Sequence, residues 1–489
     1  MLTKKTPTHK KKKTKTTKRK TQTTYDYIIL GGGIAGLYTL YKLSKKYPTK
    51  SFILLEKSER FGGRVHSVQL YQRRFELGRA SGAPDSNLTG NLVEESTGIY
   101  PNTNDPENIL EAGAGRFAES HTRLQELIRE FGLQSNVKPA SANAEYVPIE
   151  KNTPTQDSLT PIKEEHNTSN YIAKIIHSSK SESREYLQKR NFTDYAKTIL
   201  SPQEVEHIHD SFGYYSELVI MNAYDAIQLM QQLLPTNKFY VLFGGLSQII
   251  QHLVERIKKN PNTKLVLKQE VIDILSKQTQ TTTQTKPTYQ IQTKTDRFLA
   301  RNVICALPKQ NLENLSIFKP IQSTLSKILC GKLCRIYARF PTNDDIWFKD
   351  LHKMTTNNNL RMIIPGNVKK GIIMISYSDN KYADFWYKLY QKNSTELIKE
   401  LRKEIQQTTG KIIPDPIEIH VFYWSCGVGY WGLNANSTEI SQNMIQPLAK
   451  HPNIYCCGEH FSERNQQWME GALETSQKVI DRIATQNLN

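Results

Sequence analysis

A glycine-rich segment near the start of the chain has the residue types and spacing of a dinucleotide site. The apolar residues 25–30 predict a buried strand, which runs into Gly31-Gly-Gly33-Ile34-Ala35-Gly36 and then into a helical stretch. Gly31 permits a tight turn, Gly33 lets the backbone approach a pyrophosphate, and Gly36 allows close packing of the helix on the strand. The free N–H groups and the positive dipole end of that helix would then face the phosphates.

A second apolar stretch, residues 51–55, ends at Glu56, which can accept hydrogen bonds from both ribose hydroxyls. Glu56 and Lys57 open a further turn that contains Gly62, Gly63 and Arg64. An NAD enzyme needs no second glycine pair with flanking arginines at this place. A flavin enzyme uses such a turn to pass the backbone by the pyrophosphate and the ribityl chain, so the pattern favours FAD. An ordinary glycine turn with surface arginines is the alternative.

A second half-site lies near the C-terminus, where residues 453–457 predict a short strand that ends in a Gly-Glu turn. The start of a helix follows about ten residues later. This unit can place backbone donors at a flavin ring and an acid on its ribityl or pyrophosphate side. The cofactor-facing residues of the unit would be Gly458, Glu459, Trp468, Met469 and Ala472.

These two half-sites resemble those of the flavin-containing amine oxidases, a family that includes monoamine, polyamine and L-amino-acid oxidases. The resemblance spans residues 25 to about 485, and E-x-x-x-R-x-G-G-R, starting at Glu56, is its first signature. It implies an α/β fold in which a Rossmann-like FAD-binding domain of discontinuous segments joins a mixed-sheet substrate domain and a helical insert. Cys426 does not match the cysteine that links flavin covalently in some relatives, since Gly429 precedes the aromatic residue, and we expect non-covalent FAD.

The loop Gly113-Ala114-Gly115-Arg116 precedes an amphipathic helix, and we assign all four residues to the cofactor site. Arg116 also resembles the arginine that grips the substrate carboxylate in L-amino-acid oxidases. In amine and polyamine oxidases the matching position is usually aromatic or apolar. A planar guanidinium matches a carboxylate in bidentate fashion, so Arg116 favours an α-amino acid over a simple amine. A structural arginine paired with the flavin phosphates or a nearby acid is the alternative.

Four aromatic residues extend the resemblance to the substrate. Tyr377 ends a strand that resembles the one whose tyrosine contacts the carboxylate in L-amino-acid oxidases. Tyr430 and Trp431 resemble the aromatic wall that faces the flavin, and Trp468 matches a tryptophan that borders the amine. Packing roles for these residues remain open. Val271 is assigned a place near the adenine.

Three departures from the family pattern concern the chemistry. Arg335 aligns with the lysine that many members hold, through a water, near flavin N5, and Lys332 is the substitute candidate. An arginine cannot shed its proton at working pH, so Arg335 would position water without acting as a base. Gln467 replaces the usual glycine before the tryptophan, and Ser476 replaces a glycine of the closing helix.

The elements that position these residues form a chain of 489 residues with a net charge of +18. Residues 4–20 are a Lys/Thr run that we expect to be disordered, and it serves as a solubility tail, a polyanion- or nucleic-acid-binding arm or a localisation signal. The uncharged residues 27–41 are too short and too rich in glycine to span a membrane, which needs about 20 residues. None of the six cysteines forms a C-x-x-C pair. We therefore expect reduced thiols, no metal site and a cytoplasmic or other intracellular location.

The domain organisation follows from the motifs and the composition of the segments between them. Gln278–Thr295 is a low-complexity segment that predicts a hairpin loop, and whether the protein forms a homodimer is left open. The predicted segments are a basic tail (1–24), the first FAD-binding part (25–135, with an insert at 79–109), a helical lid (136–235), the second FAD-binding part (236–310), a substrate domain (311–440) and the C-terminal FAD-binding part (441–489).

The favoured function is oxidation of an L-amino acid to a 2-oxo acid and ammonia, with O2 reduced to H2O2. A monoamine or polyamine oxidase is the alternative within the family. A non-catalytic flavoprotein with a nucleic-acid-binding tail is an alternative of another class. A desaturase acting on apolar isoprenoids would share the first FAD motif but has no use for Arg116.

Overall fold

The structure is a computed structural model, and it describes residues 23–70, 107–141, 143–149, 167–233, 237–277, 288–342 and 346–488. The basic segment 4–20 and nearly all of the expected insert at 79–109 lie outside these residues. Within the described residues, no helix combines the length and the apolar character that crossing a membrane requires.

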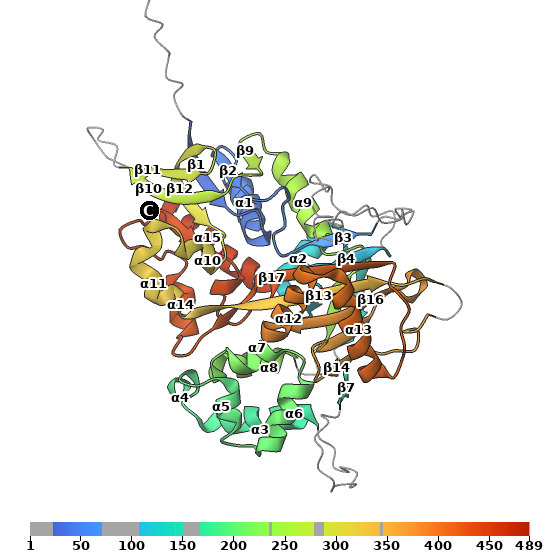
Figure 1. Cartoon of the computed structure of the whole chain (residues 1–489). Helices are drawn as coiled ribbons and strands as arrows, with labels where there is room; N and C mark the ends of the chain where they lie inside the picture. Colours follow the sequence, from blue (N-terminus) through green and yellow to red (C-terminus); the bar gives the residue numbers. More distant parts are fainter. Residues whose placement is uncertain are drawn as a thin grey trace, which may run out of the picture.

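A seven-stranded sheet forms the upper part of the molecule (Figure 1). Its parallel strands are near-continuous apolar runs, as expected for strands buried on both faces. The strand order is β10-β11-β12-β1-β2-β9, and β18 also pairs with β12. The bounds are β1 (Thr24–Leu30), β2 (Phe52–Leu55), β9 (Thr263–Val266), β10 (Val271–Lys277), β11 (Thr288–Thr293), β12 (Arg297–Cys305) and β18 (Ile454–Cys456).

Each face of this sheet has its own core. Because successive side chains of a strand point to opposite faces, Ile29 of β1 packs in one core and Ile28 and Leu30 pack in the other. The first core is covered by α1 (Ile34–Lys46), α2 (Thr122–Glu130), α9 (Ser247–Lys258) and α15 (Met469–Leu488). The second is covered by α10 (Lys309–Glu313), η5 (Ser316–Ile321), α11 (Gln322–Leu325) and α14 (Ser437–Asn443).

A second sheet of six strands has the order β17-β13-β16-β15-β14-β7. Its two longest strands, β13 and β17, are antiparallel, and their Ile328↔Trp431 end packs into the core of the first sheet. The helices α12 (Asn380–Lys392) and α13 (Ser394–Thr409) bury Trp386 against this sheet. The strand bounds are β7 (Glu145–Val147), β13 (Ile328–Arg339), β14 (Met354–Thr356), β15 (Met362–Pro365), β16 (Ile372–Asp379) and β17 (Glu418–Trp431).

A helical region lies at the bottom of the view and packs against β17 (Figure 1). Its core includes Val428 and Tyr430 of that strand, so the helices are anchored directly on the second sheet. The helices are α3 (Thr168–Ser178), α4 (Arg184–Gln188), α5 (Phe192–Ala196), α6 (Pro202–Ser211), α7 (Tyr215–Val219) and α8 (Ala223–Leu233).

Two small sheets connect these parts. β3 (Ser67–Gln69) pairs with β4 (Ile109–Glu111), and β8 (Phe239–Leu242) pairs with both β5 (Phe117–Ala118) and β6 (Val137–Ala140). The mixed α/β fold predicted from the sequence is confirmed. The expected loop at Gln278–Thr295 needs correction, because Thr288–Thr293 forms β11. The alternating side chains of that strand bury Tyr289 and Ile291 in the sheet core.

Candidate functional site

A cavity of about 940 Å³ runs between the first sheet, the second sheet and the helical region. The carboxyl ends of four parallel strands open into it. Gly31 follows β1, Glu56 follows β2, Ala306 follows β12 and Gly458 follows β18, and all four residues line the cavity. This is the edge at which open α/β sheets bind their ligands.

Most of the residues that the sequence assigns to the cofactor line this cavity. They are Gly31, Gly33, Ile34, Ala35, Glu56, Lys57, Gly62, Gly63, Arg64, Gly113, Ala114, Gly115, Arg116, Val271, Gly458, Glu459, Trp468, Met469 and Ala472. Gly36 does not. A Cβ at Gly36 would lie 2.0 Å from the carbonyl oxygen of Gly31, so this glycine lets α1 pack on the turn after β1.

The space in front of the first glycine loop fits a bound nucleotide. Gly33 caps α1, and a Cβ added to it would meet no atom of another segment closer than Gly62 O at 4.0 Å. The backbone there borders open space, as the approach of a pyrophosphate requires. Glu56 is fixed beside it, because its Oε2 accepts from Gly32 N at 2.6 Å and its Oε1 from Ser58 N at 2.9 Å. The donors, the open backbone and the placed carboxylate fit the pyrophosphate and the ribose of a dinucleotide cofactor.

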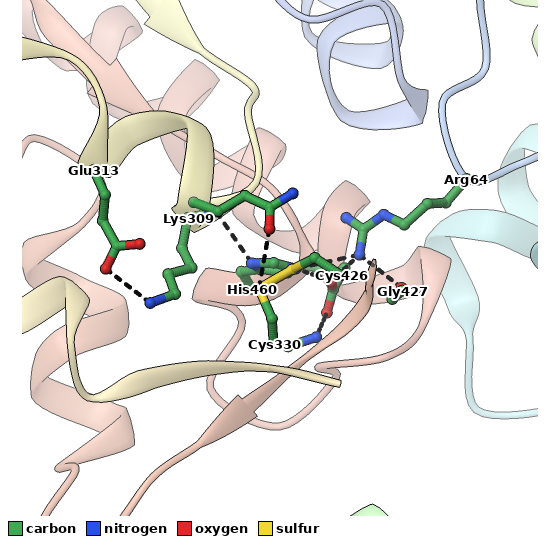
Figure 2. Close-up of a disulfide and its surroundings, with 10 residues drawn as sticks. Arg64, Lys309, Glu313, Cys330, Cys426, Gly427 and His460 are labelled. Atoms are coloured by element: carbon green, nitrogen blue, oxygen red, sulfur yellow. Dashed lines mark hydrogen bonds and ion pairs between the residues drawn. A yellow bond between two sulfur atoms is a disulfide. The ribbon is translucent and has the colours of Figure 1, made fainter. Parts of the chain in front are cut away.

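The C-terminal half-site joins the first one through a part-buried ion pair. Nη1 of Arg64 contacts the Glu459 carboxylate, Gly427 O at 2.9 Å and Nε2 of His460 at 3.2 Å (Figure 2). Burial disfavours the charged form of Glu459, but His460 and Arg64 more than offset this and hold the pKa of Glu459 well below its usual range. The two sequence motifs therefore form one charged unit.

Beside this unit, Cys330 of β13 and Cys426 of β17 form a disulfide (Figure 2). The expectation of reduced thiols is wrong for this pair, while Cys305, Cys334, Cys456 and Cys457 are free and buried. The antiparallel pairing of β13 and β17 places the two cysteines on neighbouring strands although they lie 96 residues apart. Both sulfurs are used in this bond, so they are not free to bind a metal ion with the adjacent His460.

Arg116 lines the same cavity and lies among aromatic side chains. Its guanidinium carbon is 4.6 Å from the Phe239 ring centre and 5.9 Å from that of Trp468, and Nη2 donates to the Tyr214 hydroxyl at 3.3 Å. Among the described residues, no carboxylate forms an ion pair with it. Glu217 is near enough to interact with Arg116 electrostatically, but the two side chains form no ion pair. The alternative of a structural arginine, paired with the flavin phosphates or a nearby acid, stays open.

Arg335 and Tyr377 also line the cavity and contact each other. The guanidinium carbon lies 4.5 Å from the centre of the tyrosine ring, and Nη1 donates to the carbonyl oxygen of Glu111 at 2.7 Å. Burial raises the pKa of the Glu111 carboxyl to about 7, although Leu246 N donates to it at 2.7 Å. Arg335 is thus held in place from the backbone of β4.

Besides Gly36, two residues that the sequence assigns to the site, Lys332 and Trp431, lie outside the cavity. Lys332 is part-exposed and its Nζ lies 2.6 Å from Asp384, so the expectation that it replaces the missing lysine is wrong. Tyr430 lines the cavity, but Trp431 follows it on the same strand and points to the opposite face. Trp431 packs in the core of the first sheet, and its Nε1 donates to Glu463 O at 3.2 Å.

Sequence reasoning missed a group of polar residues around Arg116, in the part of the cavity that we expect to receive the substrate and call the substrate end. Glu217 and Tyr214 come from the helical region, and Lys353 comes from the loop before β14. Burial, with Arg116 nearby, lowers the pKa of Lys353 to about 8. No motif marks these residues, because Glu217 stands in an ordinary helical stretch and only the packing of α7 brings it to the cavity.

The comparisons with known proteins agree with this architecture. An uncharacterized protein of Acanthamoeba polyphaga mimivirus is 22% identical over an alignment of 499 positions, gaps included. The alignment covers 93% of each chain. A flavin-containing amine oxidase of Oncorhynchus mykiss is 33% identical over 96 residues, which are 19% of this chain and 18% of that protein.

Among solved structures, cyclohexylamine oxidase from Brevibacterium oxydans superposes with a TM-score of 0.67 at 15% identity, covering 96% of this chain and 100% of that one. Putrescine oxidase bound to putrescine gives a TM-score of 0.66 at 15% identity, covering 94% and 99%. At this identity the likeness shows the fold. The sequence profile of flavin containing amine oxidoreductases matches residues 34–484, and the chain therefore belongs to that family.

Proposed function

We propose that this flavoprotein oxidises L-amino acids to 2-oxo acids and ammonia, with O2 as the electron acceptor and H2O2 as its product. The observation that carries the proposal is the guanidinium of Arg116, which lines the cavity without an ion-pair partner among the described residues. A permanent positive charge at the substrate end of a largely apolar cavity favours a ligand with a carboxylate.

FAD is the flavin that the residues fit best, held without a covalent bond. The loops at Gly31 and Gly62 would hold the pyrophosphate, and Glu56 would hold the ribose. The Arg64–Glu459 pair would lie on the ribityl or pyrophosphate side of the cofactor. Gly429 stands where relatives with a covalent link carry cysteine. When bound, the flavin accepts a hydride from the substrate carbon and is reoxidised by O2.

The side chains of the protein bind and orient the substrate. Arg116 and Tyr377 would hold the carboxylate, and Tyr430 would form one wall. Fixing the reacting carbon in this way lowers the barrier by up to about 7–11 kcal/mol in favourable systems. Arg335 stays protonated and, through its contact with Glu111 O and the Tyr377 ring, keeps that tyrosine in place.

The test is Arg116→Met, which removes the charge and keeps much of the apolar chain. Against L-norleucine, we expect kcat/KM to fall on the order of 100-fold, measured as peroxide and ammonia release. Against pentylamine, the same molecule without its carboxylate, the value should change little. Arg123→Met is the matched control, because Arg123 lies outside the cavity and pairs with Glu470. An equal loss on both substrates would contradict the proposal.

Oxidation of simple amines is the second candidate, and the likeness to putrescine and cyclohexylamine oxidases supports it. The aromatic surroundings of Arg116 would then bind the apolar part of an amine. The same pair of substrates separates the two candidates. A wild-type protein that oxidises pentylamine faster than L-norleucine is an amine oxidase.

A further inference from the structure

A buried carboxyl group at the substrate end of the cavity has one oxygen without a hydrogen-bond partner among the described residues. Glu217 of α7 is 3% exposed and lines the cavity. Its Oε2 is buried and has no hydrogen-bond partner in the described parts of the chain. Burial, together with the neighbouring Asp379, raises the pKa of Glu217 well above its usual range. Buried carboxyl groups are normally paired, so the missing partner needs an explanation.

The charged groups around Glu217 do not supply that partner. Asp379 is a second buried acid, and it already accepts from the backbone N–H groups of Tyr215 at 3.1 Å and Ser216 at 2.6 Å. Arg116 is near enough to act on Glu217 electrostatically, but the two side chains form no ion pair. Because Glu217 lines the cavity, a positive charge on a ligand can approach it from there.

Glu217 and the glycine loops come from different parts of the molecule. Glu217 belongs to the helical region, whereas the glycine loops end the strands of the first sheet, at the other side of the molecule (Figure 1). A substrate whose reacting carbon faces the flavin would direct its far end towards the helical region. A positive group on that end would meet the carboxylate of Glu217.

We propose that Glu217 binds the distal ammonium group of the substrate, so that the preferred substrates are L-amino acids with a basic side chain, such as L-lysine. The inference rests on the proposed function for the role of Arg116. Arg116 and Glu217 then bind the two ends of the substrate. Arg116 binds its carboxylate, and Glu217 binds its side-chain ammonium. An ammonium near Glu217 favours the ionised carboxylate that burial otherwise opposes.

Four compounds separate the two charges in the flavin-loaded, full-length protein. L-lysine has both the carboxylate and the distal ammonium, L-norleucine has only the carboxylate, cadaverine has only the distal ammonium, and pentylamine has neither. We expect wild-type kcat/KM to be on the order of 100-fold higher for L-lysine than for L-norleucine. In Glu217→Gln this ratio should approach one, while the value for L-norleucine stays within about threefold of wild type.

Different results would refute the proposed role of Glu217 and the proposed role of Arg116. If L-norleucine is oxidised as well as L-lysine by the wild type, the role of Glu217 is refuted. If Glu217→Gln slows all four compounds equally, Glu217 acts on the reacting amine or on the fold, and the distal site is refuted. If cadaverine matches L-lysine, the role of Arg116 is refuted while that of Glu217 stands.

Binding provides a second measurement that does not depend on turnover. By calorimetry on the flavin-loaded protein, 6-aminohexanoate should bind on the order of 100-fold more tightly than hexanoate, and Glu217→Gln should abolish the difference. Equal affinities in the wild type would overturn the proposal. Glu404→Gln is the matched control, because Glu404 is a buried acid that lies outside the cavity and accepts from Leu360 N at 3.0 Å. That variant should keep the preference for 6-aminohexanoate.

Discussion

The two ends of the cavity are built in different ways. The cofactor end consists mainly of backbone at the carboxyl ends of β1, β2, β12 and β18, with Gly31, Gly33 and Gly62 at the turns. The substrate end consists of side chains from the helical region, the second sheet and the β4–β5 loop. A backbone site needs glycine at set places and tolerates few other residues, whereas a side-chain site can be assembled from many segments. The cofactor end should therefore be the less tolerant of substitution.

The largest effect should come from Gly36→Ala. The added Cβ would lie 2.0 Å from the carbonyl oxygen of Gly31, so α1 must move away from β1. We expect a loss of about 3 kcal/mol or more in the free energy of unfolding, together with loss of the flavin absorbance. Gly33→Ala is the contrast, because its Cβ has room in the protein and obstructs only the ligand. If Gly36→Ala keeps both its stability and its flavin, the expectation that the cofactor end is the less tolerant of substitution is contradicted.

Glu111 should make stability depend on pH. Its pKa is about 7 in the folded protein, above the ordinary value of 4.5, so folding favours the protonated form. Stability is therefore lost as pH rises from 4.5 to 7, by about 3 kcal/mol in total. The free energy of unfolding of Glu111→Gln minus that of wild type should therefore increase from pH 4.5 to 7. Above pH 7 this difference should stay constant. Denaturant unfolding at pH 5 and pH 8 measures the difference, and an identical offset at both values would contradict it.

A smaller gain is expected at the substrate end from Gln467→Gly. Gln467 has a φ of 71°, in the left-handed region that favours glycine. Its backbone N–H donates to Oε2 of Glu459 at 2.8 Å, so the conformation is held by the ion pair at the cofactor end. Relief of this strain should stabilise the protein by about 0.5–1 kcal/mol in thermal unfolding. A destabilised variant would mean that the glutamine side chain makes contacts that outweigh the strain.

The smallest effect is expected from Lys332→Met. Its ion pair with Asp384 is part-exposed, and such pairs contribute at most about 1 kcal/mol. Turnover of the preferred substrate should remain within about twofold of wild type. A large loss of kcat would return Lys332 to the catalytic machinery and contradict its position outside the cavity.

The difference between a site built of backbone and a site built of side chains also explains what could be predicted from the sequence. The glycine turns, Glu56 and the Gly458-Glu459 turn line one cavity, because local spacing along a strand–turn–helix unit determines where they lie, and their binding of a cofactor stays a prediction. Lys332 and Trp431 were predicted incorrectly, because a displacement of one residue along a strand reverses the face to which a side chain points. Glu217 was missed, since a lone acid in a helix carries no signal of its neighbours.

The sequence by itself determined the family, the α/β fold and the turns that line the cavity, since these depend on short-range patterns of glycine and apolar residues. The tertiary structure alone decided which charges meet. It joined Arg64 to Glu459, bonded Cys330 to Cys426, and turned Arg116 and Glu217 towards one cavity. The physical reason is that such contacts depend on how distant elements pack and register with one another, and local spacing in the chain does not encode this.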